Sequence, residues 1–288
     1  MKISVIIPCF NAAETIAQQL SALAAQQWSQ PWEIIIADNG STDGTLAIVE
    51  RYQTRLPQLR VVDASEQQGT AYARNTGAKA ARGEAIAFCD ADDEVAEGWV
   101  AAIGEALSKY DFVACRFDCE KLNESWTTNY RSEQPQTTGP IEYKYPAYLP
   151  HAAGASLGIK RSVHEAIGGF DETLLCLEDT DYCWRLQLAG TELHFVPDAV
   201  IYYRFRHTVG GLYRQARFWG EYNVFLYKKY RALGMSELSW QASVKAWLHL
   251  LKCMGQIFSS KDRAKWLWLL AWRVGRLQGC LKHRVLAI

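Results

Sequence analysis

The stretch Ala85-Ile-Ala-Phe-Cys-Asp-Ala-Asp-Asp93 joins a run of apolar residues to a cluster of carboxylates. An apolar run without alternation is typical of a strand that is buried on both faces of a sheet. Open α/β sheets bind their ligands beyond the carboxyl ends of such strands, which is where Asp90 follows Cys89. The stretch therefore predicts a buried strand with a ligand site at its end.

Short apolar runs alternate with helical patterns on both sides of this stretch. The runs that predict strands are Ile3–Ile7, Glu33–Ala37, Leu59–Val62, Ala85–Cys89, Phe112–Phe117, Ala153–Lys160 and 191–196. A pattern that predicts a helix opens at Asn11, which with Glu14 has the form of a capping box, and extends to about Gln27. Further helices are predicted over about 43–55, 70–82, 95–109 and 179–189. Strands that alternate with helices of this length predict an α/β fold with a doubly wound, mostly parallel sheet.

The acidic cluster Asp90, Asp92 and Asp93 has two interpretations. Carboxylates this close in sequence repel one another unless a cation lies among them, and hard oxygen ligands suit Mg²⁺ or Mn²⁺. Such an ion could bridge the phosphates of a departing nucleotide. The alternative is an acidic turn that caps the following helix and meets its dipole. The position at the end of a strand favours the metal.

A second polar stretch, Asp38-Asn-Gly-Ser-Thr-Asp-Gly-Thr45, follows another predicted strand. An aspartate at the tip of a strand can accept hydrogen bonds from a ribose or a base edge, and the glycines let the turn close tightly. The alternative is a plain turn with a helix N-cap, which Ser, Thr and Asp all favour. That alternative is stronger for 41–43 than for Asp38.

These stretches, taken together with four others, resemble the motifs of family 2 glycosyltransferases with the GT-A fold. The six motifs are Val5–Asn11, Asp38–Thr45, Gly69–Asn75, Asp90–Asp93, Gly168–Glu172 and Leu177–Asp179, in the order and approximate spacing of that family. The resemblance implies a GT-A nucleotide-diphospho-sugar transferase fold over residues 1–210, followed by a helical extension at 211–288. It also implies transfer of a sugar from a nucleotide diphosphate with inversion at the anomeric carbon.

The resemblance implies a donor site at the ends of the first strands. The residues expected to bind the nucleotide are Pro8, Asn11, Asp38, Arg74 and Asp90. A divalent metal, Mg²⁺ or Mn²⁺, is expected on Asp90 and Asp92. Relatives usually carry a histidine that reaches the metal or the phosphates, and Tyr202 stands at that place here. His207, a few residues further on, is the expected substitute as third metal ligand. The alternatives are that His207 is structural beside its aromatic neighbours, or that Arg204, Arg206 or His207 neutralises the diphosphate. From the residues alone, Arg74 could be a solvated charge on a helix.

The resemblance implies an acceptor site on the later motifs. Asp179 matches the general base that removes a proton from the acceptor hydroxyl, and Glu178 and Asp181 are expected beside the acceptor. Adjacent like charges raise carboxyl pKa values, while the start of a helix lowers them. The alternative is that these acids only cap the helix that begins here.

Charge is divided unevenly along a chain whose formal net charge is zero. Residues 1–199 carry 15 Lys/Arg against 28 Asp/Glu, whereas residues 200–288 carry 16 against 3. Within the basic part, apolar residues recur at three- and four-residue steps at Val244, Trp247, Leu248, Leu251, Met254 and Phe258. A second helical pattern begins near Lys261. Tryptophan interleaved with Lys and Arg predicts helices that lie in the plane of a membrane surface. The alternative is a helical pair that packs on the catalytic domain.

Composition and short motifs indicate the cellular compartment of the protein and exclude some classes of function. Eight cysteines with no CxxC pair favour a reducing compartment. No apolar run reaches the ~18 residues that span a bilayer, and the apolar run that Pro8 ends is too short for a signal peptide. We therefore expect a cytoplasmic protein, peripheral on the cytoplasmic face of a membrane. No nucleic-acid-binding motif is present, and no GxGxxG follows the first strand, which argues against a dinucleotide-dependent dehydrogenase.

Three functions are compatible with these observations. The first is a glycosyltransferase that uses a UDP-, GDP- or dTDP-sugar and a glycan or lipid-linked acceptor in cell-surface polysaccharide or glycolipid synthesis. The second is a nucleotidyltransferase that makes sugar nucleotides, which normally has a glycine-rich basic loop that Pro8–Glu14 lacks. The third is a non-catalytic protein that binds nucleotide sugars at a membrane. The six motifs favour the first.

Overall fold

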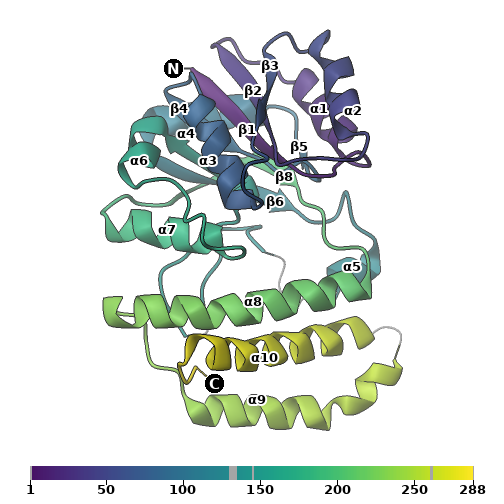
Figure 1. Ribbon diagram of the computed structural model, residues 1–288, viewed down its shortest axis with the longest axis vertical. Helices are drawn as coiled ribbons and strands as arrows, with labels where there is room; N and C mark the ends of the chain where they lie inside the picture. The colour runs from purple at the N-terminus through teal and green to yellow at the C-terminus, as the bar shows by residue number, and fades with distance from the viewer. Residues whose placement is uncertain (1, 130–134, 145, 260–261, 288) are drawn as a thin grey trace. The chain divides into compact units, whose positions relative to one another are not determined.

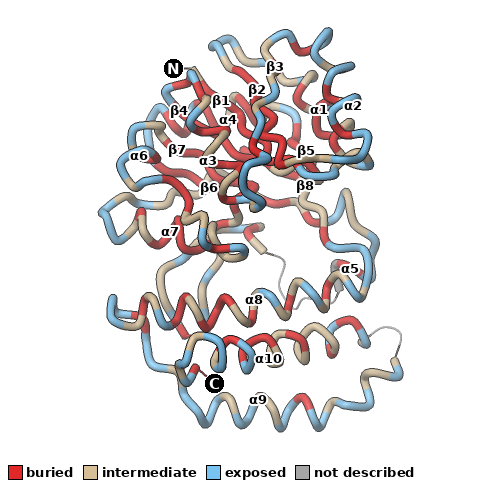
Figure 2. Tube along the Cα trace, in the orientation of Figure 1, coloured by how far each residue is buried: buried red, intermediate tan, exposed pale blue. Residues whose placement is uncertain are grey.

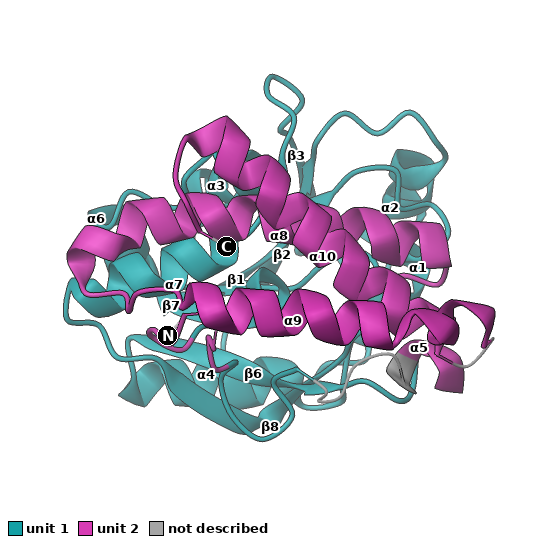
Figure 3. Cartoon of the chain, turned by 90° about the horizontal axis from the view of Figure 1, so that it is seen from below, with its two compact units in different colours: residues 1–122, 135–141, 151–204 teal, residues 123–134, 142–150, 205–288 magenta. Residues whose placement is uncertain are grey.

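The computed structural model describes residues 2–129, 135–144, 146–259 and 262–287 (Figure 1). The chain divides into two compact units. Unit 1 contains residues 1–122, 135–141 and 151–204, and unit 2 contains residues 123–134, 142–150 and 205–288 (Figure 3). Two segments that precede residue 151 therefore belong to the same unit as the C-terminal helices.

Unit 1 is built on one sheet, which has eight strands in the described part of the chain. Their order is β3-β2-β1-β4-β7-β6-β8-β5. The strands are β1 (Ile3–Cys9), β2 (Trp32–Asp38), β3 (Leu59–Asp63), β4 (Ala85–Phe88), β5 (Glu94–Val95), β6 (Phe112–Asp118), β7 (Leu157–Lys160) and β8 (His194–Tyr202). Strands β7 and β5 pair antiparallel to their neighbours, and the other pairings are parallel. The predicted mostly parallel α/β sheet is confirmed.

Helices surround this sheet and bury its strands. They are α1 (Ile16–Ala24), α2 (Thr45–Gln53), α3 (Thr70–Ala80), α4 (Trp99–Lys109), α6 (Arg161–Ala166) and α7 (Glu178–Leu188), with a 3₁₀ turn η1 (Gly154–Ser156) before β7. The residues of β1 and β4 are all buried (Figure 2), as expected for strands covered on both faces. Gly77 of α3 allows the helix to approach the sheet closely, because a Cβ there would overlap the side chain of Ile6.

Four predicted boundaries are wrong. The first helix begins at Ile16 and not at Asn11, whose backbone has a positive φ, and the strand expected over 191–196 spans His194–Tyr202.

The other two wrong boundaries involve distant parts of the chain. The helix expected over 95–109 begins at Trp99, because Glu94 and Val95 form β5, which pairs with β8. The strand expected from Ala153 begins at Leu157, because η1 precedes it. Both differences arise where a short segment pairs with, or turns towards, a distant part of the chain, which local patterns do not encode.

Unit 2 is helical. Its elements are α5 (Ser125–Asn129), α8 (Val209–Tyr230), η2 (Arg231–Leu233), α9 (Trp240–Lys252), η3 (Met254–Phe258) and α10 (Arg263–His283). Helix α10 packs closely along α8 (Figure 1). Glycines make this approach possible, because a Cβ on Gly275 would overlap the carbonyl oxygen of Arg217, and one on Gly220 would overlap that of Trp272. In the described part of the chain, no helix has both the length and the apolar composition that a bilayer crossing requires.

Candidate active site

The loops that follow β1 and β2 are joined by hydrogen bonds. Asn11, in the left-handed region with φ of 50°, accepts a hydrogen bond from the backbone N of Thr42 at 2.8 Å through Oδ1. Its own backbone N donates to Ser41 Oγ at 3.0 Å. Pro8 is a buried residue of β1 and pairs with Ala37 of β2. The predicted nucleotide residues Pro8 and Asn11 thus lie where these two strands end, beside the turn after Asp38.

Asp38 is the last residue of β2 and is buried. Its Oδ2 accepts hydrogen bonds from the backbone N of Gly40 at 3.3 Å and of Ser41 at 3.1 Å. Its Oδ1 is also buried and has no hydrogen-bond partner among the described residues. A buried carboxylate oxygen without a partner costs free energy, so this atom is available to a ligand that donates a hydrogen bond.

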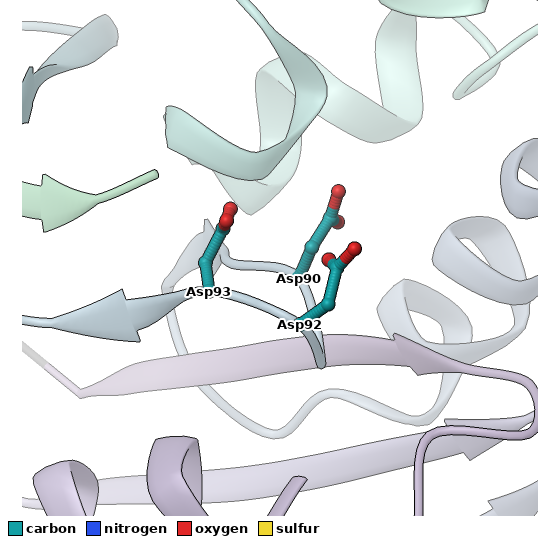
Figure 4. A group of neighbouring side chains, drawn as sticks. All are labelled: Asp90, Asp92 and Asp93. Atoms are coloured by element: carbon teal, nitrogen blue, oxygen red, sulfur yellow. The ribbon is translucent and has the colours of Figure 1, made fainter. Parts of the chain in front are cut away.

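The acidic cluster forms a turn between β4 and β5 (Figure 4). Oxygens of Asp90, Asp92 and Asp93 lie within 4.8 Å of one another, and the three side chains extend to the same side of the turn. Because the turn leads into a strand, the interpretation as a helix cap is wrong. The structure therefore brings together three carboxylates that could hold one metal ion, as the sequence predicts.

Asp93 is the most buried member of this cluster, with 1% of its surface exposed. Its Oδ1 accepts a hydrogen bond from the backbone N of Arg204 at 2.8 Å, and its Oδ2 is buried without a hydrogen-bond partner in the part of the chain that is described. Burial, and then the charges of Asp92 and Asp90, raise the pKa of Asp93 well above its ordinary value. A cation among the three carboxylates would remove this penalty.

Two side chains hold the acidic turn in place, and sequence reasoning gave them no such role. Gln19 of α1 donates to the carbonyl oxygen of Asp90 at 3.1 Å and accepts from the backbone N of Val95 at 2.9 Å. Arg204 donates through Nε to the carbonyl oxygen of Asp92 at 2.7 Å. Gln19 has a recognisable signal, since it is a polar residue on the buried face of α1 beside Leu20.

Arg74 of α3 connects the acidic turn to α7. Its Nη2 lies 2.9 Å from Asp90 Oδ1 and its Nη1 lies 2.8 Å from Glu178 Oε1, while only 3% of its side chain is exposed. Burial lowers the pKa of Arg74, but Asp90 and Glu178 outweigh that effect and raise it. Gly154 leaves space for the guanidinium, since a Cβ there would overlap it. Arg74 is therefore a buried charge between two carboxylates and not a solvated one; its contact with a nucleotide stays a prediction.

Helix α7 begins with the predicted acceptor-side acids. Asp179 accepts hydrogen bonds from the backbone N of Gly154 at 2.9 Å and of Thr180 at 2.7 Å. For its neighbour Glu178, burial and then the charge of Asp179 raise the pKa to about 7, although Arg74 opposes the shift. The two carboxylates thus lie side by side, one held by backbone N–H groups and the other by a buried guanidinium.

Asp181 has a different partner in unit 1, and His207 belongs to unit 2. Asp181 is fully buried and forms an ion pair with Arg185 at 2.8 Å, and Arg185 also donates to the carbonyl oxygen of Gly169 at 2.6 Å. Asp181 therefore has a partner inside the protein, and its contact with an acceptor stays a prediction. Tyr202 is the last residue of β8, with the ammonium of Lys121 3.8 Å from its ring centre. His207 belongs to unit 2, and its role as a metal ligand also stays a prediction.

Comparison with known proteins identifies the family. The model described as glycosyl transferase family 2 matches residues 4–168, which is more than half of the chain, and the chain therefore belongs to that family. The chain is 32% identical over 147 residues to the uncharacterised glycosyltransferase YfnE of Bacillus subtilis, covering 51% of this chain and 37% of that protein. It is 29% identical over 202 residues to the glycosyltransferase AglE of Haloferax volcanii, covering 69% and 65%. The match thus spans less than two thirds of either relative.

The fold is shared with solved structures. The mannosyltransferase PcManGT from Pyrobaculum calidifontis, in complex with GDP-Man and Mn²⁺, superposes with a TM-score of 0.65 over 96% of this chain and 86% of that chain, at 20% identity. At this level of identity the likeness concerns the fold alone. Together with the family match, it confirms the predicted GT-A fold.

Proposed function

We propose that this protein transfers a sugar from a nucleotide diphosphate to a hydroxyl of a glycan or lipid-linked acceptor, with inversion, in the synthesis of a cell-surface polysaccharide or glycolipid. The observation that carries the proposal is the chain of contacts from Asp90 through Arg74 to Glu178, next to Asp179. It joins the predicted donor carboxylates to the predicted acceptor base within one unit of a family 2 glycosyltransferase fold. We place the catalytic machinery in residues 1–210 and regard 211–288 as an extension.

The donor side of the proposal rests on the two unsatisfied carboxylate oxygens. We assign the base or ribose of the nucleotide to Asp38, whose buried Oδ1 can accept a hydrogen bond from it. The donor set of Asp90, Asp92 and Asp93 fits Mg²⁺ or Mn²⁺, because all three offer hard oxygen ligands and Asp93 has a buried oxygen that no described group satisfies. When bound, the ion would neutralise charge that develops on the diphosphate. We assign Asp90 and Asp92 as its principal ligands.

The acceptor side of the proposal rests on Asp179. Its carboxylate is oriented by the backbone N–H groups of Gly154 and Thr180, and it can still accept a proton from a hydroxyl, since carboxylate oxygens have several acceptor positions. Removal of that proton makes the hydroxyl oxygen a better nucleophile for the anomeric carbon. Glu178 cannot turn freely beside it, because Arg74 holds one of its oxygens. We therefore assign proton removal to Asp179 and alignment of the site to Arg74 and Glu178.

The charge of the C-terminal part of the chain suggests that the protein binds its acceptor at a membrane surface. Residues 200–288 carry 16 Lys/Arg against 3 Asp/Glu, which complements the anionic cytoplasmic leaflet of a membrane. We propose that the protein is cytoplasmic and peripheral on that face, where lipid-linked acceptors lie.

Binding and turnover of sugar nucleotides test the function. Purified protein with Mn²⁺ or Mg²⁺ is screened against UDP-, GDP- and dTDP-sugars by thermal shift, because a ligand specific for the native state raises the unfolding temperature. We expect one nucleotide class to stabilise the wild type and release of nucleoside diphosphate once an acceptor is supplied. Asp92→Ala should lose the metal-dependent part of this stabilisation. Stabilisation without turnover on any acceptor would favour the non-catalytic alternative. Release of pyrophosphate in a separate reaction, supplied with a nucleoside triphosphate and a sugar 1-phosphate, would favour a nucleotidyltransferase.

A further inference from the structure

Helix α9 and the turn η3 expose apolar side chains along one side. These side chains, which we call the apolar row, are Trp240, Val244, Leu248, Leu251, Met254 and Phe258. They follow one another at steps of three or four residues. The four members in α9, Trp240, Val244, Leu248 and Leu251, therefore lie on one face of that helix, and Met254 and Phe258 follow in the 3₁₀ turn η3. Their exposed fractions run from 47% at Val244 to 85% at Phe258. An amphipathic helix of a globular protein normally buries such a row, whereas Figure 2 shows α9 largely exposed.

A different face holds α9 within unit 2. Leu250 is buried, and its carbonyl oxygen accepts a hydrogen bond from Trp266 Nε1 of α10 at 3.0 Å. The ring of Trp247 lies 5.8 Å from the guanidinium carbon of Arg273, also on α10. At about 100° per residue, Leu250 lies roughly 115° around the helix from the centre of the four row members in α9, and Trp247 lies between Leu250 and the row. The packing of unit 2 therefore does not account for the row.

Positive charge borders the apolar row. Lys245 and Lys252 are exposed, and both lie on the flank of α9 next to the row and away from Leu250. The sequence carries no aspartate or glutamate between Glu237 and Asp262. An apolar face with lysines at its edge, on a helix too polar to cross a bilayer, is typical of segments that lie in the plane of a membrane surface.

We propose that the apolar row inserts into an anionic lipid bilayer, with Lys245 and Lys252 at the level of the headgroups. A second copy of the chain is the other candidate occupant, but a symmetric interface places the same patch on both partners. Lys245 and Lys252 would then face a surface that carries the same positive charge and no acid to compensate it. Anionic lipid offers both an apolar interior and complementary charge. This inference rests on the membrane location proposed above and not on the chemistry of unit 1.

Flotation with lipid vesicles tests the proposal on the full chain. One set of vesicles is phosphatidylcholine, and the other contains about one third phosphatidylglycerol. The test variant is Leu248→Ser with Leu251→Ser. The matched control is Leu188→Ser with Leu233→Ser, because these leucines have similar exposure, 47% and 54% against 51% and 61%, and lie outside the row. A third variant, Lys245→Gln with Lys252→Gln, tests the charge.

The expected results differ between the variants. Wild type and the control should float with the anionic vesicles, and the Leu248/Leu251 variant should bind them at least about tenfold more weakly. The lysine variant should also bind the anionic vesicles about 30-fold more weakly, while its weak binding to phosphatidylcholine stays unchanged. Equal flotation of wild type and the Leu248/Leu251 variant would overturn the proposal. A wild-type dimer that binds neither vesicle, and that this variant dissociates, would assign the row to a second copy instead. Donor binding, measured by thermal shift, reports separately on the transferase proposal.

Discussion

Replacing Arg74 with methionine is the perturbation that the structure makes most informative. Methionine has a similar length and no charge, so Arg74→Met removes the guanidinium and leaves Glu178 buried, with 12% of its side chain exposed, beside Asp179. Breaking a buried ion pair by removing one partner costs about 3–5 kcal/mol. For a chain of this length about 2 °C of unfolding temperature corresponds to 1 kcal/mol, so we expect a decrease of roughly 6–10 °C at pH 8.

The cost of Arg74→Met should depend on pH with a definite sign. In the folded wild type the pKa of Glu178 is raised from 4.5 to about 7, so its protonated form stabilises the fold at low pH and this contribution is lost as the pH rises through 7. Removing Arg74 removes the charge that opposes the shift, and the pKa of Glu178 rises further. The variant therefore loses more stability than the wild type between pH 6 and pH 8, by at most about 1.4 kcal/mol. The added Glu178→Gln substitution should abolish this difference.

Thermal unfolding with a chelator present, at pH 6 and pH 8, measures these quantities. The control is Arg161→Met, because Arg161 and Glu165 form an exposed pair 3.9 Å apart in the same unit, which contributes about 0–1 kcal/mol. If Arg74→Met costs no more than Arg161→Met, the ion pairs of Arg74 do not stabilise unit 1. If its cost is equal at both pH values, Glu178 is not the carboxylate that loses its partner.

Three other substitutions address separate parts of the molecule. Asp38→Ala should weaken binding of the donor nucleotide about 10–100-fold in a titration, since it removes a charge-assisted hydrogen bond; unchanged affinity would contradict its role. Asp179→Asn should lower kcat about 10²–10⁴-fold with little change in KM for the donor, and full activity would remove the base assignment. Gly275→Ala should destabilise unit 2 by about 1–3 kcal/mol, because its Cβ would overlap the Arg217 carbonyl, whereas Gly255→Ala, with open space around it, should not.

Local patterns were sufficient for the strands of the central sheet but not for its edge. The apolar runs of β1, β2 and β4 identify themselves because strands covered on both faces have no polar alternation. β5, by contrast, has two residues, Glu94 and Val95, and exists because it pairs with β8 more than 100 residues later in the chain. A segment this short has no periodicity, so only the tertiary pairing defines it.

In the candidate site, too, local motifs predicted some residues, whereas contacts between residues far apart in the sequence could not be predicted. The order of the motifs indicated Asp90, Asp92 and Asp179, and the position of Asp90 at the end of a strand follows from the apolar run before it. The partners of Arg74 could not be predicted from the sequence, because Glu178 is 104 residues away and nothing near Arg74 in the sequence indicates that it is buried. Likewise, the apolar spacing of α9 predicted an amphipathic helix. Trp247 of the predicted stripe packs on α10, but the packing face also contains Leu250, which lies off that stripe.

The burial of Arg74 has a consequence for how such a site can change. A guanidinium with 3% exposure is stable only while carboxylates compensate it, so the turn that carries Asp90 and the helix start that carries Glu178 are held within reach of one side chain. Asp90 belongs to the cluster that we assign to the metal, and Glu178 adjoins the residue that we assign as the base. A substitution at any of these three positions therefore disturbs both sides of the reaction together. We therefore expect substitutions that change specificity for the sugar or the acceptor to be better tolerated in loops that this ion-paired group does not hold.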